Sequence, residues 1–241
     1  MANDLTPKRE GRKRNAVTTS ERIRQTALEL FSTQGYEATG IRELADRVGM
    51  TTASLYHYVG TKAELLTDIM RDSQARLLTA AHSALADVSE PPARVARLVH
   101  IHVLAHAIFQ LEARTVDTEL RVLDPSSLEE ILDARDEYEQ LWRDAIVAGC
   151  ETGVFVVPDP STARLAIMSM STGVAHWYKP DRSDTPAKLA RNFSDLALAL
   201  LRATDATGNA LDTTALGLGD PSELIPLLGP AAPVSAPRDA R

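Results

Sequence analysis

Residues 19–66 read TSERIRQTALELFSTQGYEATGIRELADRVGMTTASLYHYVGTKAELL, and this stretch decides the fold of the chain. In its first run, apolar residues recur every three or four positions, beginning after a capping position at Ser20 and stopping at Gly35. A second, shorter run covers residues 41–48 and ends at Gly49, where a residue without a Cβ can take positive φ. The pattern predicts two helices followed by a tight turn.

A third helix is predicted over residues 51–58, directly after the turn. Leu55 and Val59 form its packing side, which leaves short donors and acceptors pointing outward: Thr51, Thr52, Ser54, Tyr56 and His57. Such side chains suit base edges and phosphates, as a helix lying in the DNA major groove requires. A generic helical hairpin shows the same apolar spacing, so spacing alone leaves both interpretations open.

Four runs in this stretch, residues 35–39, 41–45, 48–50 and 55–66, resemble the head of a TetR-family transcriptional repressor. The resemblance implies an all-α fold with an N-terminal three-helix helix-turn-helix DNA-binding domain. A helical ligand-binding and dimerisation domain would follow it. The implied partners are double-stranded operator DNA, a second copy of the chain and a small effector.

The resemblance also implies roles for single residues. Tyr56 and Lys62 stand where the family pattern touches DNA phosphates, and other residues of the third helix face the bases. The chain departs from the pattern at Gly40, where the family often has a hydroxyl residue that helps to start the second helix, and at Tyr58, where it often has His. We expect Thr39 to cap the second helix instead, and we include Thr39 and Tyr58 among the DNA-binding residues.

A basic segment precedes the predicted DNA-binding domain, which we assign to residues 18–64. Residues 8–14 read KREGRKR and have no apolar periodicity. We expect residues 1–17 to be a flexible basic arm whose Arg12 and Arg14 follow the phosphates or enter the minor groove. The alternative interpretation is a solvated tail.

Composition excludes several classes of protein. The chain has 241 residues, of which 44% are hydrophobic and 24% charged, and its one Cys rules out a disulfide scaffold. No apolar run reaches the roughly 18 residues that a membrane helix needs, and the basic start lacks the apolar core of a secretory signal. We therefore expect a cytoplasmic protein with no membrane partner.

Charge is distributed unevenly along the chain. The net charge is -7, but residues 1–70 hold ten Lys and Arg against nine Asp and Glu, whereas residues 71–241 hold sixteen against twenty-four. The acidic part therefore lies behind the head. Because duplex DNA repels it, this part helps to orient the head toward DNA.

The predicted effector-binding and dimerisation domain covers residues 65–205. A connecting helix is expected over residues 62–87, and further helices begin at prolines that suit a first turn: Pro91, Pro125, Pro160 and Pro186. The first of these is expected to continue through Leu111. Residues 154–157 are apolar but lie between Gly153 and Pro158, so we expect a short connector rather than a strand.

The last two helices, at about residues 159–178 and 185–203, are implied by the resemblance to pair with their copies in a homodimer. The alternative is that they only close the core of one chain. From residue 206 to residue 241 the chain is rich in Gly, Ala and Pro, which predicts a mobile tail, although the apolar residues 224–228 leave docking on the body open.

Six histidines raise the question of metal binding or catalysis. His102 and His106 are four residues apart and share a helical face, the spacing of a zinc-binding pair. No Cys cluster or acidic companion motif supports such a site, and Cys150 stands alone. The chain has no Gly-rich phosphate loop, nucleophile elbow or HExxH motif. We therefore expect no metal, no cofactor and no enzymatic activity.

The C-terminal part is more loosely similar to TetR-family members that sense acyl-CoA thioesters, through residues 135–138, 149–155 and 173–181. The resemblance implies an apolar cavity lined by His102, His106, Phe109, Tyr138, Trp142, Met170 and Trp177. Arg114 or Arg135 would meet an anionic group of the ligand. The alternative is that the aromatic residues are ordinary core and the arginines pair with neighbouring acids.

These features predict a repressor that a small hydrophobic effector, such as an acyl-CoA thioester or another lipid-like molecule, releases from a pseudo-palindromic operator. One alternative is a constitutive DNA-binding dimer whose body recruits a partner protein. It differs from the sensing hypothesis in requiring a filled body without a cavity of ligand size.

Overall fold

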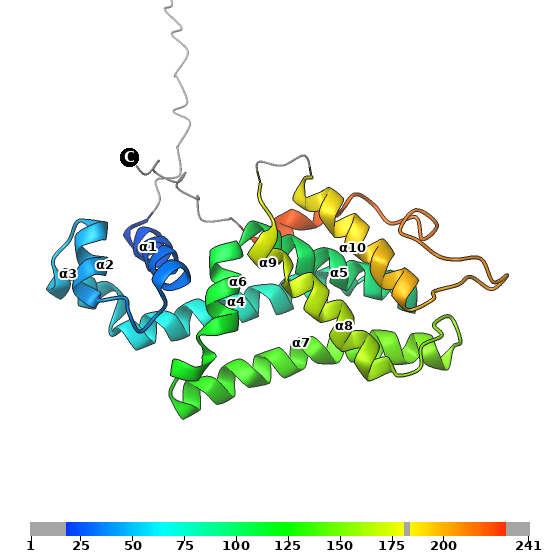
Figure 1. The fold of residues 1–241 in the computed structure, drawn as a ribbon, viewed down its shortest axis with the longest axis horizontal. Helices are drawn as coiled ribbons and strands as arrows, with labels where there is room; N and C mark the ends of the chain where they lie inside the picture. Colours follow the sequence, from blue (N-terminus) through cyan, green and yellow to red (C-terminus); the bar gives the residue numbers. More distant parts are fainter. Residues whose placement is uncertain (1–17, 181–183, 230–241) are drawn as a thin grey trace, which may run out of the picture.

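The structure, a computed structural model, describes residues 18–180 and 184–229, and almost all regular structure in these ranges is helical (Figure 1). Within them the β pairing is limited to an isolated antiparallel bridge between Thr204 and Ala210. The expectations for the basic arm, including Arg12 and Arg14, and for the last part of the tail lie outside the described residues. No helix in the described part of the chain is long and apolar enough to cross a membrane.

Three helices form the head at one end of the molecule: α1 (Thr19–Gln34), α2 (Ile41–Val48) and α3 (Thr52–Val59) (Figure 1). The cap of α1 is Thr18 rather than Ser20. The Thr18 hydroxyl accepts from the Glu21 backbone N at 3.1 Å, and the Glu21 carboxylate accepts from the Thr18 N at 2.7 Å. This reciprocal pair needs a Glu three residues after the cap; Thr18 has Glu21 at that position, whereas Ser20 has Ile23.

The turns of the head follow the predicted pattern. Gly35 and Gly49 end α1 and α2 with φ values of 87° and 77°. The Thr51 hydroxyl caps α3 by accepting from the Ser54 N at 3.2 Å. Thr39 does not cap α2, because its hydroxyl instead donates to the Gly35 carbonyl at 2.8 Å.

The N-cap of α2 is Gly40, which makes no side-chain cap hydrogen bond. Its φ of -83° and ψ of 139° suit any residue, and an added Cβ would meet no atom within 4 Å. We therefore expect Gly40→Ser to stabilise the chain by about 0.5–1 kcal/mol, through a cap hydrogen bond and a less flexible unfolded chain. Urea unfolding measures this, with Gly49→Ser as a control that must destabilise because its φ is positive. An unchanged urea midpoint for Gly40→Ser would contradict the prediction.

The head continues into the body through α4 (Lys62–Leu85), and α5 (Pro91–Ile108), α6 (Gln110–Thr118) and α7 (Pro125–Glu151) follow it. A short 3-10 helix, η1 (Leu120–Val122), precedes α7. The expected continuous helix through Leu111 is wrong. The chain leaves helical geometry at Phe109, with φ of -106° and ψ of 45°, and α6 then packs against α1 of the head.

The remaining helices are α8 (Pro160–Thr172), α9 (Val174–Trp177) and α10 (Pro186–Leu200). The predicted starts of α8 and α10 are confirmed. Asp159 and Thr185 accept hydrogen bonds from first-turn backbone N–H groups, and each stands directly before a proline that has no N–H to satisfy. The predicted single helix through Trp177 breaks at Gly173, which separates α8 from α9.

Two hydrophobic cores hold the chain together. The head core contains buried residues of α1, α2 and α3, and it also takes in α4 up to Met70, Val116 of α6 and Ile131 of α7. The expected domain boundary at residue 64 therefore falls inside a packed unit. In the body core, Phe155 of the connector lies against Gly149 of α7, where a Cβ would overlap with its ring.

The expected mobile tail is wrong for residues 206–229, where the structure instead shows the docking on the body that the apolar residues 224–228 had left open. This segment folds back and ends in η2 (Pro221–Leu228), which packs against α4, α5 and α10. Leu224 and Leu228 are buried in the body core. The prediction failed because it followed the high Gly, Ala and Pro content of the segment. A few apolar side chains are enough to hold the segment on the body by their burial.

Candidate DNA-binding helix and effector cavity

Helix α3 lies at the outer end of the head (Figure 1). Its exposed side chains are polar or aromatic. Leu55 is fully buried and anchors the helix, while Tyr56 and Tyr58 are 46% and 50% exposed. Among the other predicted DNA-binding residues, Thr51, Ser54 and His57 are exposed and Thr52 is half-buried. Buried leucine on one side and exposed side chains on the other give α3 the geometry of a recognition helix.

Thr39 and Lys62 lie differently from the other predicted DNA-binding residues. Thr39 is only 1% exposed, so the structure does not present its hydroxyl to a partner. The Lys62 ammonium donates to the carbonyl oxygens of Tyr36 at 2.8 Å and Thr39 at 2.9 Å, and it lies 4.0 Å from the centroid of the Tyr36 ring. Lys62 therefore fixes the start of α4 against the α1–α2 connection.

An open cavity of about 470 Å³ lies in the body between α4, α5, α6, α7, α8 and α9. Four predicted ligand-binding residues line it: His102, His106, Arg135 and Tyr138. The sequence analysis missed the remaining lining residues, which are Gln74, Leu77, Asp117, Glu139, Leu165, Met168, Ser169, Thr172, Gly173 and His176. Most of them are polar or aliphatic, whereas the prediction favoured aromatic residues.

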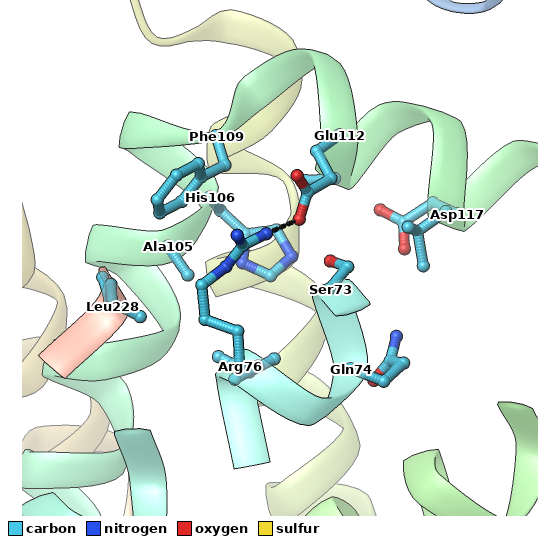
Figure 2. A pocket seen from close by; sticks show the side chains of 12 residues that line it. Ser73, Gln74, Arg76, Ala105, His106, Phe109, Glu112, Asp117 and Leu228 are labelled. Atoms are coloured by element: carbon cyan, nitrogen blue, oxygen red, sulfur yellow. Dashed lines mark hydrogen bonds and ion pairs between the residues drawn. The ribbon is translucent and has the colours of Figure 1, made fainter. Parts of the chain in front are cut away.

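Phe109 lines a smaller pocket of about 50 Å³, together with His106, Arg76 and Glu112 (Figure 2). The other four predicted ligand-binding residues line neither space. Trp142 is fully buried behind His102, Met170 is half-buried, and the Arg114 guanidinium donates to the Gln110 carbonyl at 3.3 Å. Trp177 is 53% exposed and stacks on Phe193, with ring centroids 6.1 Å apart.

A buried histidine pair forms the inner wall of the cavity. His102 hydrogen-bonds to the Tyr138 hydroxyl at 3.1 Å and to the Thr172 hydroxyl at 2.9 Å, and its ring stacks on His106 with centroids 4.0 Å apart. His106 Nδ1 lies 2.8 Å from the His102 carbonyl oxygen, which can only accept, so Nδ1 carries the proton. Burial lowers the pKa of both histidines, and both are therefore neutral at pH 7.

Charges on the cavity wall are compensated within the chain. The Arg135 guanidinium donates to the Val116 carbonyl at 3.1 Å and lies 3.6 Å from the Asp117 carboxylate. Burial raises the pKa of Asp117 and lowers the pKa of Arg135. Glu139 forms an ion pair with Arg164 of α8. The wall therefore offers hydrogen-bonding groups without an excess of either charge.

A buried carboxylate connects the wall of the smaller pocket to the head. Glu112 of α6 pairs with Arg76 of α4 (Figure 2), and it lies 3.5 Å from the guanidinium of Arg24 in α1. Arg24 also pairs with Asp72 at 2.7 Å and donates to the Ile69 carbonyl at 3.1 Å. No sequence motif marks this cluster, because its members are far apart along the chain.

Comparisons with known proteins agree with this arrangement. The family described as bacterial regulatory proteins, tetR family, matches residues 23–69, and the family described as tetracyclin repressor-like, C-terminal domain, matches residues 88–201. The HTH-type transcriptional repressor KstR2 of Rhodococcus jostii is 26% identical over 180 residues, which cover 71% of this chain and 85% of that protein.

Solved structures share the fold. A bacterial regulatory protein in the tetR family from Rhodococcus RHA1 is 30% identical with a TM-score of 0.71, covering 79% of this chain and all of that chain. AibR in complex with isovaleryl coenzyme A and operator DNA has a TM-score of 0.68 at 23% identity, covering 78% of this chain and 100% of that chain. The chain therefore belongs to the TetR family of transcription regulators, whose members bind operator DNA as dimers, and it is not an enzyme.

Proposed function

We propose that this regulator is a repressor that leaves a pseudo-palindromic operator when a small, largely hydrophobic effector fills the body cavity. The single observation that carries the proposal is the cavity itself. Its volume of about 470 Å³ falls within the usual range for small-molecule sites. The alternative of a constitutive DNA-binding dimer that recruits a partner protein expects a filled body, so the cavity favours sensing.

The proposed effector is an acyl-CoA thioester or another lipid-like molecule. Leu77, Leu165 and Met168 give the cavity an apolar wall suited to an acyl chain or a ring system. The relative AibR, whose structure contains isovaleryl coenzyme A and operator DNA, supports this class of ligand. The relative KstR2, described as a transcriptional repressor, supports repression rather than activation.

The proposed DNA contacts come from α3 and the residues around it. Bases would be read by Thr51, Thr52, Ser54, His57 and Tyr58, and phosphates would be bound by Tyr56, Lys62, Arg12 and Arg14. The Lys62 ammonium uses two of its three N–H groups on the Tyr36 and Thr39 carbonyls, so only its third N–H would reach a phosphate. Thr39 is withdrawn from this set, because its side chain is buried.

The proposed homodimer pairs the last helices, at about residues 159–178 and 185–203. Their outward faces carry Trp177, Leu196 and Leu200, all large apolar side chains that are exposed in the single chain. Burying such a surface against a second copy would stabilise a two-fold dimer, which matches two operator half-sites.

Operator release is the direct test. An operator is first selected from a random duplex pool with the full chain, and its affinity is then measured with and without saturating octanoyl coenzyme A or isovaleryl coenzyme A. We expect at least one of them to weaken operator binding by about tenfold or more, which corresponds to about 1.4 kcal/mol of coupling.

A cavity-filling variant provides the control for this test. Met168→Trp adds a ring to the cavity wall, so it is expected to bind the operator normally and to lose the response to the effector. An effector lowers operator affinity only if it binds the DNA-released state of the protein more tightly than the DNA-bound state. Equal operator affinities for the unmodified chain with and without every thioester or lipid tested would favour the constitutive alternative.

A further inference from the structure

The main cavity and the smaller pocket meet at four shared residues: Gln74, Leu77, His106 and Asp117. Two of these, Gln74 and His106, are deeply buried, with 8% and 7% of their surface exposed. Figure 2 shows the end of the Gln74 side chain directed from α4 toward the side of the pocket where Asp117 lies. Polar side chains thus converge where the two spaces join.

Both buried residues have unused hydrogen-bonding capacity. Among residues 18–180 and 184–229, the Gln74 carboxamide has no hydrogen-bond partner, and His106 uses only Nδ1, which donates to the His102 carbonyl. The free polar atoms of both residues open into the cavity and are not sealed in the core. A ligand that enters the cavity excludes the water that can hydrate these atoms, so it binds best when it supplies hydrogen-bonding partners of its own.

The chemistry of these groups defines what the ligand must offer. Because Nδ1 of neutral His106 carries the proton, its Nε2 is an acceptor, while Gln74 offers both an N–H donor and a carbonyl acceptor. A hydroxyl group donates one hydrogen bond and accepts others, so it can satisfy Nε2 and the Gln74 amide together. A carboxylate cannot donate to Nε2, and an ammonium can donate to Nε2 and to the Gln74 carbonyl but leaves the Gln74 N–H without an acceptor.

The electrostatics of the wall exclude a charged group on separate grounds. Arg135 already faces Asp117 at 3.6 Å, and Glu139 is paired with Arg164. An ionic group inserted here would lose its hydration without gaining an uncompensated counter-charge. An uncharged polar group pays no such penalty.

We propose that the end of the effector inserted at this junction is uncharged and carries a hydroxyl group that hydrogen-bonds to Gln74 and His106. The apolar body of the ligand then lies against Leu77, Leu165 and Met168. This inference rests on the proposed function, because it assigns the chemistry of the ligand for the same cavity. Within the proposed class of lipid-like effectors, the inference selects molecules that carry a hydroxyl group.

Three probes of equal chain length test the selectivity of the full chain by calorimetry: n-octanol, octanoate and octylammonium. We expect n-octanol to bind about tenfold more tightly than either charged probe. Gln74→Leu and His106→Phe should each weaken n-octanol binding by about tenfold, the effect of one hydrogen bond. His100→Phe is the matched control, since His100 is also buried but lines neither space, and its affinity for n-octanol should stay unchanged.

A thioester pair identifies the source of the hydroxyl group. If ω-hydroxyoctanoyl coenzyme A binds more tightly than octanoyl coenzyme A, the hydroxyl group belongs to the acyl chain of a thioester. If the two thioesters bind equally and n-octanol still binds more tightly than the charged probes, the hydroxyl group belongs to a free alcohol. Equal affinities for the three probes, a preference for a charged probe, or no binding of n-octanol would overturn the inference. Those results leave the proposed function to be judged by operator release, which is measured separately.

Discussion

Replacing Thr52 and His57 together by alanine is expected to lower operator affinity by at least about thirtyfold without unfolding the head. Each side chain that contacts a base contributes about 1–3 kcal/mol of discrimination, so two lost contacts remove at least about 2 kcal/mol. Neither side chain makes a hydrogen bond to another described residue. The burial of Leu55, which anchors α3, is untouched.

The measurement compares binding to the selected operator with binding to a shuffled duplex. Loss of base contacts lowers the first affinity and leaves the second nearly unchanged, whereas loss of a phosphate contact lowers both. The matched control is Thr79→Ala with His82→Ala, the same two residue types exposed on α4 away from the head. If the Thr52 and His57 variant protected the same genomic sequences as the unmodified chain, α3 would not be the recognition helix.

The helices of the head and the starts of α3, α8 and α10 were predictable because their signals are local, although the predicted caps of α1 and α2 were wrong. Capping hydrogen bonds join residues two or three positions apart, and first-turn prolines need no partner, so Thr51, Asp159 and Thr185 mark their helices in the sequence itself. The stop at Gly49 is similarly local, since a residue without a Cβ takes positive φ at little steric cost. The roles of these residues in DNA binding stay predictions.

The helix breaks and the cavity lining depend on contacts between residues that are far apart in the sequence. No local sequence pattern therefore predicts them. The Gln110 amide, at the start of α6, donates to the Tyr178 carbonyl at 2.7 Å, a contact between segments far apart in the sequence. Gln74 looks like an ordinary polar residue of a long helix until the fold turns it toward the cavity. Trp177 was wrongly predicted to line the cavity, because aromatic side chains are usually buried, whereas this ring is half exposed.

Ligand in the cavity affects DNA only if the body and head move together, and Glu112 is where their polar contacts converge. Its carboxylate faces Arg76, which lies 4.5 Å from the Phe109 ring at the smaller pocket, and Arg24 of the first head helix. Nearby, the Glu119 carboxylate accepts from the Tyr36 backbone N at 3.2 Å. Glu112 lies in α6 and Glu119 directly follows it. A shift of α6 would therefore change the contacts of these two carboxylates with Arg24 and Tyr36 of the head.

Glu112→Gln is accordingly expected to lower the free energy of unfolding by about 2–3 kcal/mol. Removing one member of a fully buried ion pair costs about 3–5 kcal/mol, but here both arginines keep partial exposure and Arg24 retains Asp72. Urea unfolding measures the loss, and operator release by effector should shrink toward no response, since the tie between α1 and α6 is weakened.

Glu130→Gln separates this role from a general effect of losing a carboxylate. Glu130 pairs with Arg71 at 2.6 Å on the exposed surface, where such a pair contributes about 0–1 kcal/mol. Each variant removes one negative charge from a contact between a glutamate and an arginine. The two glutamates differ in burial and in the helices that their ion pairs connect. Equal losses of stability would show that the Glu112 cluster is no stronger than a surface pair, and undiminished operator release in Glu112→Gln would place the coupling between cavity and head elsewhere, along α4.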